Sequence, residues 1–223
     1  MVVILICRGE GMERRIIRYC AIGDSLTVGI GSDIFSKGFI TRYVYLTRQA
    51  LNTRVHPAVF GKTGATTGDI LKSLNHPFLY KGIKEADIIT ITAGGNDLID
   101  AAKQFLQDKK EEDFFIALEK GKRNLEDIIK RLTDIKQNDQ RYIIRMMNLY
   151  NPFPEIKGVD KWVEAFNHNI ESLTKSPLIK VADIHHLFMG KEQEVLSSDH
   201  IHPNHRGYCL IANALTKLGY DPL

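Results

Sequence analysis

The run Ala86–Thr92, which reads ADIITIT, restricts the possible folds of this chain more than any other segment. It is mostly apolar and β-branched, and Gly94 and Gly95 follow it closely, which is typical of a parallel strand buried on both faces. Shorter apolar runs predict further strands at Ile16–Ile22, Val55–Phe60, Tyr142–Asn148 and Leu178–Ala182. Between them, apolar residues at helical spacing predict helices at Gly38–Leu51, Thr67–Leu74, Phe114–Ile135, Lys161–Thr174 and about His205–Leu218.

Strands that alternate with helices predict right-handed crossovers and a parallel sheet. We therefore expect an α/β fold, a three-layer α/β/α sandwich of flavodoxin-like type around a central five-stranded parallel sheet. The 223 residues suit one domain of ordinary size, which we place at residues 12–223. We expect residues 1–11 to be a disordered tail or an over-extended start, because Met12 begins a second plausible start.

The composition argues against several classes of partner. The chain has 30 Lys and Arg residues and 27 Asp and Glu residues, a net charge of +3, which is too balanced for a nucleic-acid partner. No apolar run is long enough to span a membrane, and Met1–Cys7 lacks the basic region and cleavage site of a signal peptide. We therefore expect no integral membrane association. The 3 cysteines have no short spacing, which argues against a disulfide framework or a zinc site.

Ligands of such sheets bind beyond the carboxyl ends of the strands, so the residues just after each strand are the candidates for chemistry. Gly23-Asp24-Ser25 follows the first strand, and its serine either presents a hydroxyl to a ligand or simply caps the next helix. We expect Asp24 to brace this turn by accepting backbone N–H groups. After the second strand, GKTGATTG at 61–68 is either a plain loop or a place where a backbone N–H approaches a ligand.

The third and last strands lead to two more candidates. In AGGND at 93–97, the Asn96 amide can donate to an oxyanion, although an Asn-Asp pair also suits a turn. In SSDHIHPN at 197–204, Asp199 stands three residues before His202, close enough to orient the imidazole. The histidines of this region could instead be surface groups or metal ligands, but no matching acidic or Cys set accompanies them. Together, the strand-end residues supply the nucleophile, oxyanion donors, base and acid that acyl transfer needs.

Four segments of the chain resemble motif blocks of the SGNH (GDSL) hydrolase family. They are AIGDSLTVGIGS at 21–32, GKTGATTG at 61–68, TAGGND at 92–97 and SSDHIHPN at 197–204, in the family's order and spacing. The resemblance extends over almost the whole chain from about Ile17, and four blocks in register are far more specific than any one of them. The bacterial lipase, esterase and lysophospholipase group, which includes lipases of Bacillus spore germination, is the most similar.

This resemblance implies a role for each matching residue. Ser25 takes the position of the nucleophile, His202 that of the general base and Asp199 that of the acid. The N–H of Gly64, the side-chain amide of Asn96 and the N–H of Ser25 take the positions of the oxyanion donors. No metal ion and no organic cofactor is implied.

The sequence thus predicts a serine ester hydrolase, a lipase, esterase or lysophospholipase that acts on a small ester or a lipid, and is cytoplasmic or spore-associated. A carbohydrate esterase or an acyl-thioesterase on the same scaffold stays open, as does a non-catalytic nucleotide- or ligand-binding module. Gly29-Ile30-Gly31 suggests such a module, but Ile34 stands where a dinucleotide-binding motif has its third glycine. His200 departs from the family pattern, since many members carry a small residue there. Nothing in the sequence indicates an oligomeric state.

We expect the loops Leu98–Lys110, Tyr150–Asp160 and Ile184–Ser197 to build the acyl pocket. Their apolar residues either line a channel for a fatty acyl chain or pack the loops onto the body of the domain. These residues are Leu98, Ile99, Phe105, Leu106, Phe153, Leu187, Phe188 and Met189. Arg145 lies inside a predicted strand, where it should occupy a strand edge or pair with a buried acid.

Overall fold

The computed structural model describes residues 15–32, 38–137 and 141–223, and it confirms the predicted α/β architecture. Five parallel strands form one sheet in the order β2-β1-β3-β4-β5. Their bounds are β1 Ile17–Gly23, β2 Val55–Gly61, β3 Ile88–Thr92, β4 Ile143–Met147 and β5 Ile179–Ala182. Each strand overlaps a predicted one. The tail expected at residues 1–11 lies outside the described residues.

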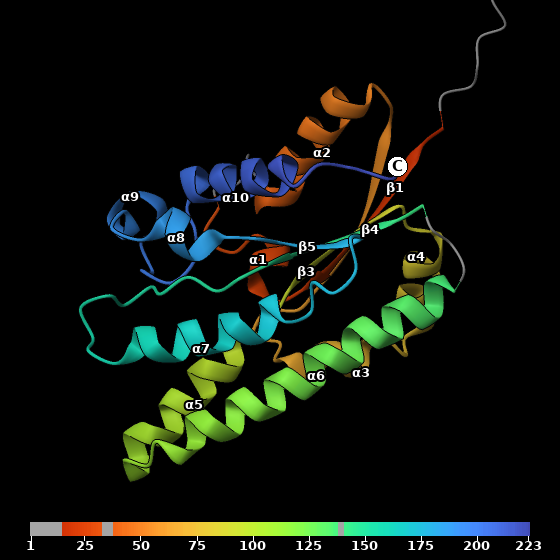
Figure 1. Cartoon of the computed structure of the whole chain (residues 1–223). Coiled ribbons are helices and arrows are strands. Elements are labelled where there is room, and N and C mark those ends of the chain that lie inside the picture. The colour runs from red at the N-terminus through yellow and green to blue at the C-terminus, as the bar shows by residue number, and fades with distance from the viewer. Residues whose placement is uncertain (1–14, 33–37, 138–140) are drawn as a thin grey trace, which may run out of the picture.

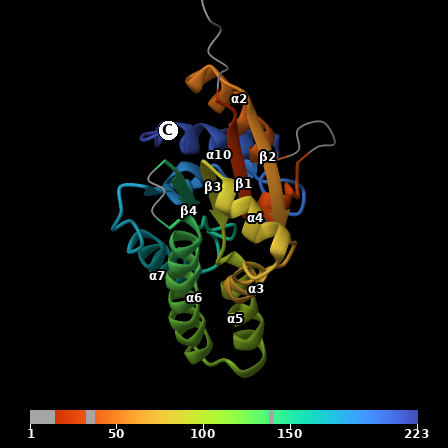
Figure 2. The same cartoon turned by 90° about the vertical axis from the view of Figure 1, so that its right-hand side faces the viewer.

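The helices cover both faces of this sheet. They are α1 Ser25–Val28, α2 Gly38–Leu51, α3 Thr67–Ser73, α4 Pro77–Glu85, α5 Gly95–Asp108, α6 Glu112–Lys136, α7 Val159–Glu171, α8 Ile184–Phe188, α9 Glu192–Val195 and α10 His205–Lys217. Helices α3 to α7 pack on one face, and α2 with α8, α9 and α10 packs on the other (Figures 1 and 2). The sheet is therefore the middle layer of a three-layer sandwich.

The alternation of side chains along the strands divides the core into two parts. In β1, Cys20 and Ile22 face the layer of α3 to α7, whereas Tyr19 and Ala21 face the layer of α2 and α10. Every residue of β3 is buried, as its uninterrupted apolar run predicts.

The predicted loop Leu98–Lys110 is wrong, because most of it belongs to α5. Leu98, Ala101 and Phe105 recur at helical spacing along this segment and form its inner face. Leu98 and Ala101 are buried, and the Phe105 ring lies 5.8 Å from the ring of Phe114 on α6. Packing against α6 thus buries the apolar face of an amphipathic helix, and the spacing of these residues was a helical signal that the loop prediction overlooked.

Two further helical segments were not predicted. Helix α4 has Pro77 at its first position, where the missing N–H and the fixed φ of proline suit a helix start. The predicted loop Ile184–Ser197 contains the short helices α8 and α9. Phe188 at the end of α8 is 1% exposed and belongs to the core, so for this residue the packing interpretation holds.

Arg145 lies in β4 between two neighbouring strands, and its side chain is fully buried, so the predicted strand edge is wrong. Its guanidinium donates to backbone carbonyls, among them Leu178 O at 3.1 Å and Gly219 O at 2.7 Å, where an acid was expected. Lys180 donates to Leu218 O at 2.9 Å. Carbonyls at the end of a helix lack partners within the helix and carry its negative dipole end, so the two cations fasten the end of α10 to the sheet.

The parallel register brings the ends of three strands to one edge of the sheet. Gly23 at the end of β1 lies opposite Gly61 of β2 on one side and Thr92 of β3 on the other. A Cβ at Gly23 would lie 2.0 Å from Thr92 Oγ1, so only glycine lets these strand ends approach so closely. The segments that contain Ser25 and Asn96 therefore start side by side.

Gly94 precedes α5 with a φ of 112°, and a Cβ there would lie 2.2 Å from the ring of Phe166. Gly94→Ala should lower the free energy of unfolding by about 2–6 kcal/mol, because overpacking and backbone strain add up. Urea or thermal unfolding measures this loss. Gly95→Ala is the control, because a Cβ there meets nothing within 4 Å. Equal stability of the two variants would contradict the packing described at Gly94.

Candidate active site

Ser25 is the first residue of α1, and Asp24 is the residue that caps this helix. The Asp24 carboxylate accepts the N–H of Leu26 at 3.0 Å and the hydroxyl of Thr92 at 2.8 Å. Burial raises the pKa of Asp24, and these hydrogen bonds offset part of the rise. Asp24 therefore braces the turn as expected. The cap interpretation considered for Ser25 is wrong, because its neighbour fills that role.

Ser25, His202 and Asp199 come together beyond the end of β1. The Nε2 atom of His202 lies 2.8 Å from Ser25 Oγ, and its Nδ1 atom lies 2.6 Å from Asp199 Oδ2. Ser25 is 8% exposed, and the side chains of His202 and Asp199 are 19% and 42% exposed. When Nδ1 holds its proton against the carboxylate, Nε2 presents a lone pair to the serine hydroxyl.

Hydrogen bonds fix the carboxylate of Asp199 in this arrangement. Its Oδ1 atom accepts the N–H groups of Ile201 and His202, each at 2.9 Å, and the hydroxyl of Ser197 at 2.8 Å. Partial burial raises the pKa of Asp199, but the hydrogen bonds from His202, Ile201 and Ser197 lower it by more, to well below its ordinary value. Asp199 is therefore a carboxylate over the whole neutral range of pH.

The glycines of Gly29-Ile30-Gly31 make room for the histidine segment. A Cβ at Gly31 would lie 2.7 Å from Pro203 O and 2.8 Å from the Cβ of His202. Gly29 ends α1 in a left-handed conformation. The pattern that suggested nucleotide binding thus lets a segment from the far end of the chain pack against α1.

Side chains from other elements hold the His202 segment in place. Tyr150 donates its hydroxyl to Ile201 O at 2.7 Å, and Asn204 caps α10 by accepting the N–H of Gly207 at 3.0 Å. His200 is exposed and has a left-handed φ of 57°, a conformation that glycine adopts most readily and that histidine adopts more often than most other residues. His202 is thus the histidine that contacts Ser25.

The two other predicted oxyanion donors lie on neighbouring segments. Asn96, the second residue of α5, donates one amide hydrogen to Ala65 O at 2.9 Å. Its side-chain amide has a second hydrogen to offer. Gly64 directly precedes Ala65 and has a left-handed φ of 77°. The bond from Asn96 therefore joins the segment after β3 to the segment after β2.

Thr67 and Asp97 make a second connection between these segments, which the sequence analysis missed. The backbone N–H and the hydroxyl of Thr67 donate to the two oxygens of Asp97, at 2.8 and 2.7 Å. Asn124 of α6 donates to the Thr67 hydroxyl at 2.9 Å. Burial raises the pKa of Asp97, and the bonds from Thr67 counteract this rise. The position of Asp97 directly after Asn96 was the only signal in the sequence for this role.

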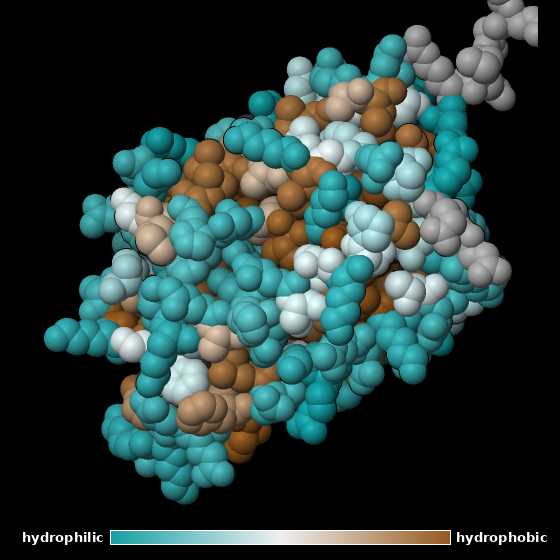
Figure 3. Space-filling model, in the orientation of Figure 1, coloured by the Kyte–Doolittle hydropathy of each residue, from teal (hydrophilic) through white to brown (hydrophobic). Residues whose placement is uncertain are grey.

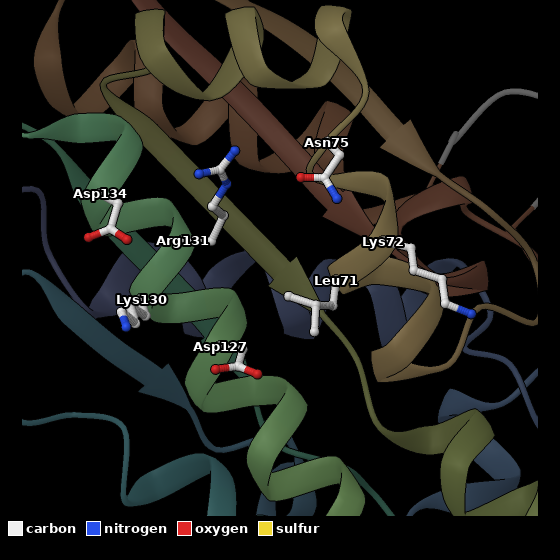
Figure 4. A pocket seen from close by; sticks show the side chains of 7 residues that line it. All are labelled: Leu71, Lys72, Asn75, Asp127, Lys130, Arg131 and Asp134. Carbon is white, nitrogen blue, oxygen red and sulfur yellow. The ribbon is translucent and has the colours of Figure 1, made fainter.

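Other features of the molecule lie apart from this site. Cys20 is 1% exposed, and burial raises the pKa of its thiol to about 12, which keeps it protonated. A hollow of about 310 Å³ lies between α3 and α6. The residues that line it, shown in Figure 4, are Leu71, Lys72, Asn75, Asp127, Lys130, Arg131 and Asp134. A second hollow of about 490 Å³ lies beside β5. Neither is lined by any of the five predicted site residues.

Metal-binding clusters and membrane-spanning helices are both absent from the described residues. These residues contain no group of three or more His, Cys, Asp or Glu side chains that could hold a metal ion. None of the helices in the described ranges is long and apolar enough to cross a membrane.

Comparisons with known proteins identify the class of this chain. The model of the GDSL-like Lipase/Acylhydrolase family matches residues 21–210. Spore germination lipase LipC of Bacillus licheniformis is 41% identical over 93% of this chain and 98% of its own length. The uncharacterized protein YpmR of Bacillus subtilis is 32% identical over 91% of this chain and 81% of its own length. The chain therefore belongs to the GDSL-like lipase/acylhydrolase family, and the structure carries the fold expected of SGNH hydrolases.

Solved structures agree with this assignment. The lipase Lip_vut3 from a goat rumen metagenome is 41% identical, superposes with a TM-score of 0.89, and is covered over 99% of its chain and 92% of this one. A family 3 carbohydrate esterase of Clostridium thermocellum is 18% identical with a TM-score of 0.63, over 91% of this chain and 94% of its own. At that identity the second likeness reports the fold alone.

Thr67→Val removes one hydroxyl, so Asp97 Oδ1 and the Asn124 amide each lose a hydrogen bond, while the Thr67 N–H still donates to Asp97 Oδ2. We expect the free energy of unfolding to fall by about 1–3 kcal/mol and kcat for ester hydrolysis to fall roughly tenfold, because the segments of Gly64 and Asn96 lose a connection. Chemical denaturation and steady-state kinetics measure both effects. Thr133→Val makes the same change on α6, where the hydroxyl bonds only to carbonyls of its own helix, and should alter neither. Unchanged kcat in Thr67→Val would refute the positioning role.

Proposed function

We propose that the protein is a serine ester hydrolase that cleaves carboxylic esters through an acyl-enzyme on Ser25, with His202 as the general base. The observation that carries this proposal is the 2.8 Å contact between His202 Nε2 and Ser25 Oγ, in a residue whose other ring nitrogen faces Asp199. A nucleophile, a base and a group that orients the base in this geometry are the parts that acyl transfer requires.

The proposed reaction has two halves. In the first, Ser25 Oγ attacks the ester carbonyl while His202 takes its proton, and His202 then protonates the leaving alcohol. In the second, a water molecule gives a proton to His202 while its oxygen attacks the acyl-enzyme, and His202 then returns that proton to Ser25 Oγ as the carbonyl carbon–Oγ bond breaks and the acid leaves. Asp199 stays ionised throughout and stabilises the imidazolium, in keeping with its lowered pKa.

Each tetrahedral intermediate places a negative charge on the former carbonyl oxygen. We assign the N–H groups of Ser25 and Gly64 and the free amide hydrogen of Asn96 as the donors that stabilise it. The bond from Asn96 to Ala65 O supports this assignment, because it fixes the amide beside the segment of Gly64 before substrate binds. No step of this cycle requires a metal ion or an organic cofactor.

For the substrate we propose a lipid ester, with a lysophospholipid included among the candidates. The names of two relatives at 41% identity support this choice, since one is a spore germination lipase and the other a lipase. The same likeness favours the spore-associated location over the cytoplasmic one. We also propose that residues 12–223 act as one hydrolase domain, because the described part is built around one sheet.

Ser25→Ala removes the proposed nucleophile and should lower kcat on p-nitrophenyl esters by a factor on the order of a thousand or more. Labelling by a fluorophosphonate, followed by peptide mapping, should place the label on Ser25 in the wild type and find none in the variant. Ser73→Ala is the control, because the Ser73 hydroxyl donates only within α3, to Ile70 O. A label on another residue, or hydrolysis at the wild-type rate in Ser25→Ala, would overturn the proposal.

Asn96→Ala removes one proposed oxyanion donor. We expect kcat to fall on the order of 100- to 1,000-fold with little change in KM, because the bond forms fully only in the transition state. Asn169→Ala is the matched control, since the Asn169 amide donates to Leu118 O on α6. If kcat falls by the same factor in both variants, Asn96 has no special part in the reaction.

A further inference from the structure

Four large apolar side chains are exposed where α5 turns into α6 and where α7 begins. Leu106 is 67% exposed, Phe115 57%, Ile116 56% and Ile156 52%. Figure 3 shows hydrophobic residues on the surface over this end of the α5–α6 pair, surrounded by hydrophilic ones. Single exposed apolar residues are common, but a group of them marks an interaction surface. We call these four residues the apolar tip.

The apolar tip stands on a rigid support. Behind it, the rings of Phe105 and Phe114 lie 5.8 Å apart, and the rings of Phe114 and Trp162 stack at 4.7 Å. Trp162 is 7% exposed, and Lys161 lies 4.5 Å above its ring while binding Glu111 at 2.8 Å. These aromatic contacts join α5, α6 and α7, so the support is packed while the four side chains of the apolar tip stay more than half exposed.

The apolar tip lies at the same end of the molecule as Ser25. Asn96 is the second residue of α5, and Leu106 lies ten residues further along the same helix, about 15 Å away, in its last turn. Figure 1 shows the α5–α6 turn and the segment before α7 projecting at the end toward which the strands point. A lipid surface in contact with the apolar tip would therefore lie on the side of the molecule where the carboxyl ends of the strands are.

The charges around the apolar tip are balanced. Between positions 103 and 120 the lysines are Lys103, Lys109, Lys110 and Lys120, and the acids are Asp108, Glu111, Glu112, Asp113 and Glu119. Between 155 and 161 they are Lys157 and Lys161, with Glu155 and Asp160. Six lysines and seven acids leave the two signs nearly balanced, which complements headgroups that carry a phosphate and an ammonium together. An anionic membrane would instead favour an excess of lysine.

We propose that the apolar tip docks the enzyme onto a surface of zwitterionic phospholipid, so that the edge of the sheet with the site stays close to a supply of lipid esters. This rests on the lipid-ester function proposed above. The four side chains insert among the headgroups and acyl chains, and the mixed charges around them pair with the phosphate and ammonium groups. Along α5, Leu106 lies about 15 Å from Asn96, so docking acts on access to substrate and leaves the chemical step unchanged.

The test uses Leu106→Gln/Ile116→Gln/Ile156→Gln, which keeps Phe115 because its ring contacts Trp162 at 5.0 Å. In sedimentation with phosphatidylcholine vesicles, the variant should bind more weakly than wild type, by a factor on the order of ten or more. Its kcat/KM on soluble p-nitrophenyl butyrate should stay within about twofold of wild type, which also shows that it folds. Its hydrolysis of phospholipid in the same vesicles should fall with binding.

The control variant places the same substitutions on exposed apolar residues elsewhere, Tyr45→Gln/Val59→Gln/Phe78→Gln. These side chains are 53%, 50% and 74% exposed, on α2, β2 and α4. The control should bind vesicles like wild type. Wild-type binding by the tip variant overturns the proposal, as does binding that needs anionic lipid and disappears in high salt. If wild type forms a dimer that the tip variant loses, and wild type does not bind vesicles, then the apolar tip binds a second copy of the chain and the proposal fails.

Vesicle binding of Ser25→Ala separates this proposal from the proposed function. Docking requires no catalysis, so the inactive variant should bind phosphatidylcholine vesicles like wild type. If Ser25→Ala stays active while the tip variant loses binding, the nucleophile assignment fails and docking stands. If the tip variant binds normally while Ser25→Ala is inactive, docking fails and the nucleophile assignment stands.

Discussion

The close approach of β1 and β3 at Gly23 and Thr92 is the contact on which the site depends. Because a Cβ at Gly23 would lie 2.0 Å from Thr92 Oγ1, the two strands end side by side. Thr92 then reaches across to Asp24, whose carboxylate starts the helix of Ser25. The same strand end leads directly into α5 and Asn96. Because Gly23 has no Cβ, the proposed nucleophile and a proposed oxyanion donor start from neighbouring strand ends.

The sequence allowed much of this fold to be predicted, because the five strands are short apolar runs that end in polar or glycine-rich segments. The rule that chemistry follows the strands also placed Ser25, Asn96 and Asp199 with His202 at one edge. Helix α5 was missed although Leu98, Ala101 and Phe105 stand at helical spacing, because its apolar residues were assigned to a pocket-forming loop. The partners of Arg145 were missed because they are backbone carbonyls, which leave no trace in a sequence.

The positioning contacts of the site were harder to predict than its reactive groups. Thr67 and Asp97 are 30 positions apart, and Tyr150 contacts a carbonyl 51 positions away. Neither pair has a spacing that periodicity or a short motif can reveal, since each pairing depends on how β2, β3 and β4 come to lie in the sheet. Gly31 shows the reverse case: a visible glycine pattern suggested a ligand, yet its purpose is to admit Pro203 and His202.

The approach of His202 to Gly31 has a consequence for the order in which the enzyme becomes competent during synthesis. Ser25 and His202 are 177 positions apart, and the chain leaves the ribosome from its amino end. The serine, its turn and the paired strands β1 to β3 are complete while the histidine segment is still unmade. The segment of His202 comes just before α10, whose far end Arg145 and Lys180 hold to the sheet. A nascent chain, or one truncated before this segment, therefore holds the proposed nucleophile without its base, and activity has to wait until the segment of His202 has been made.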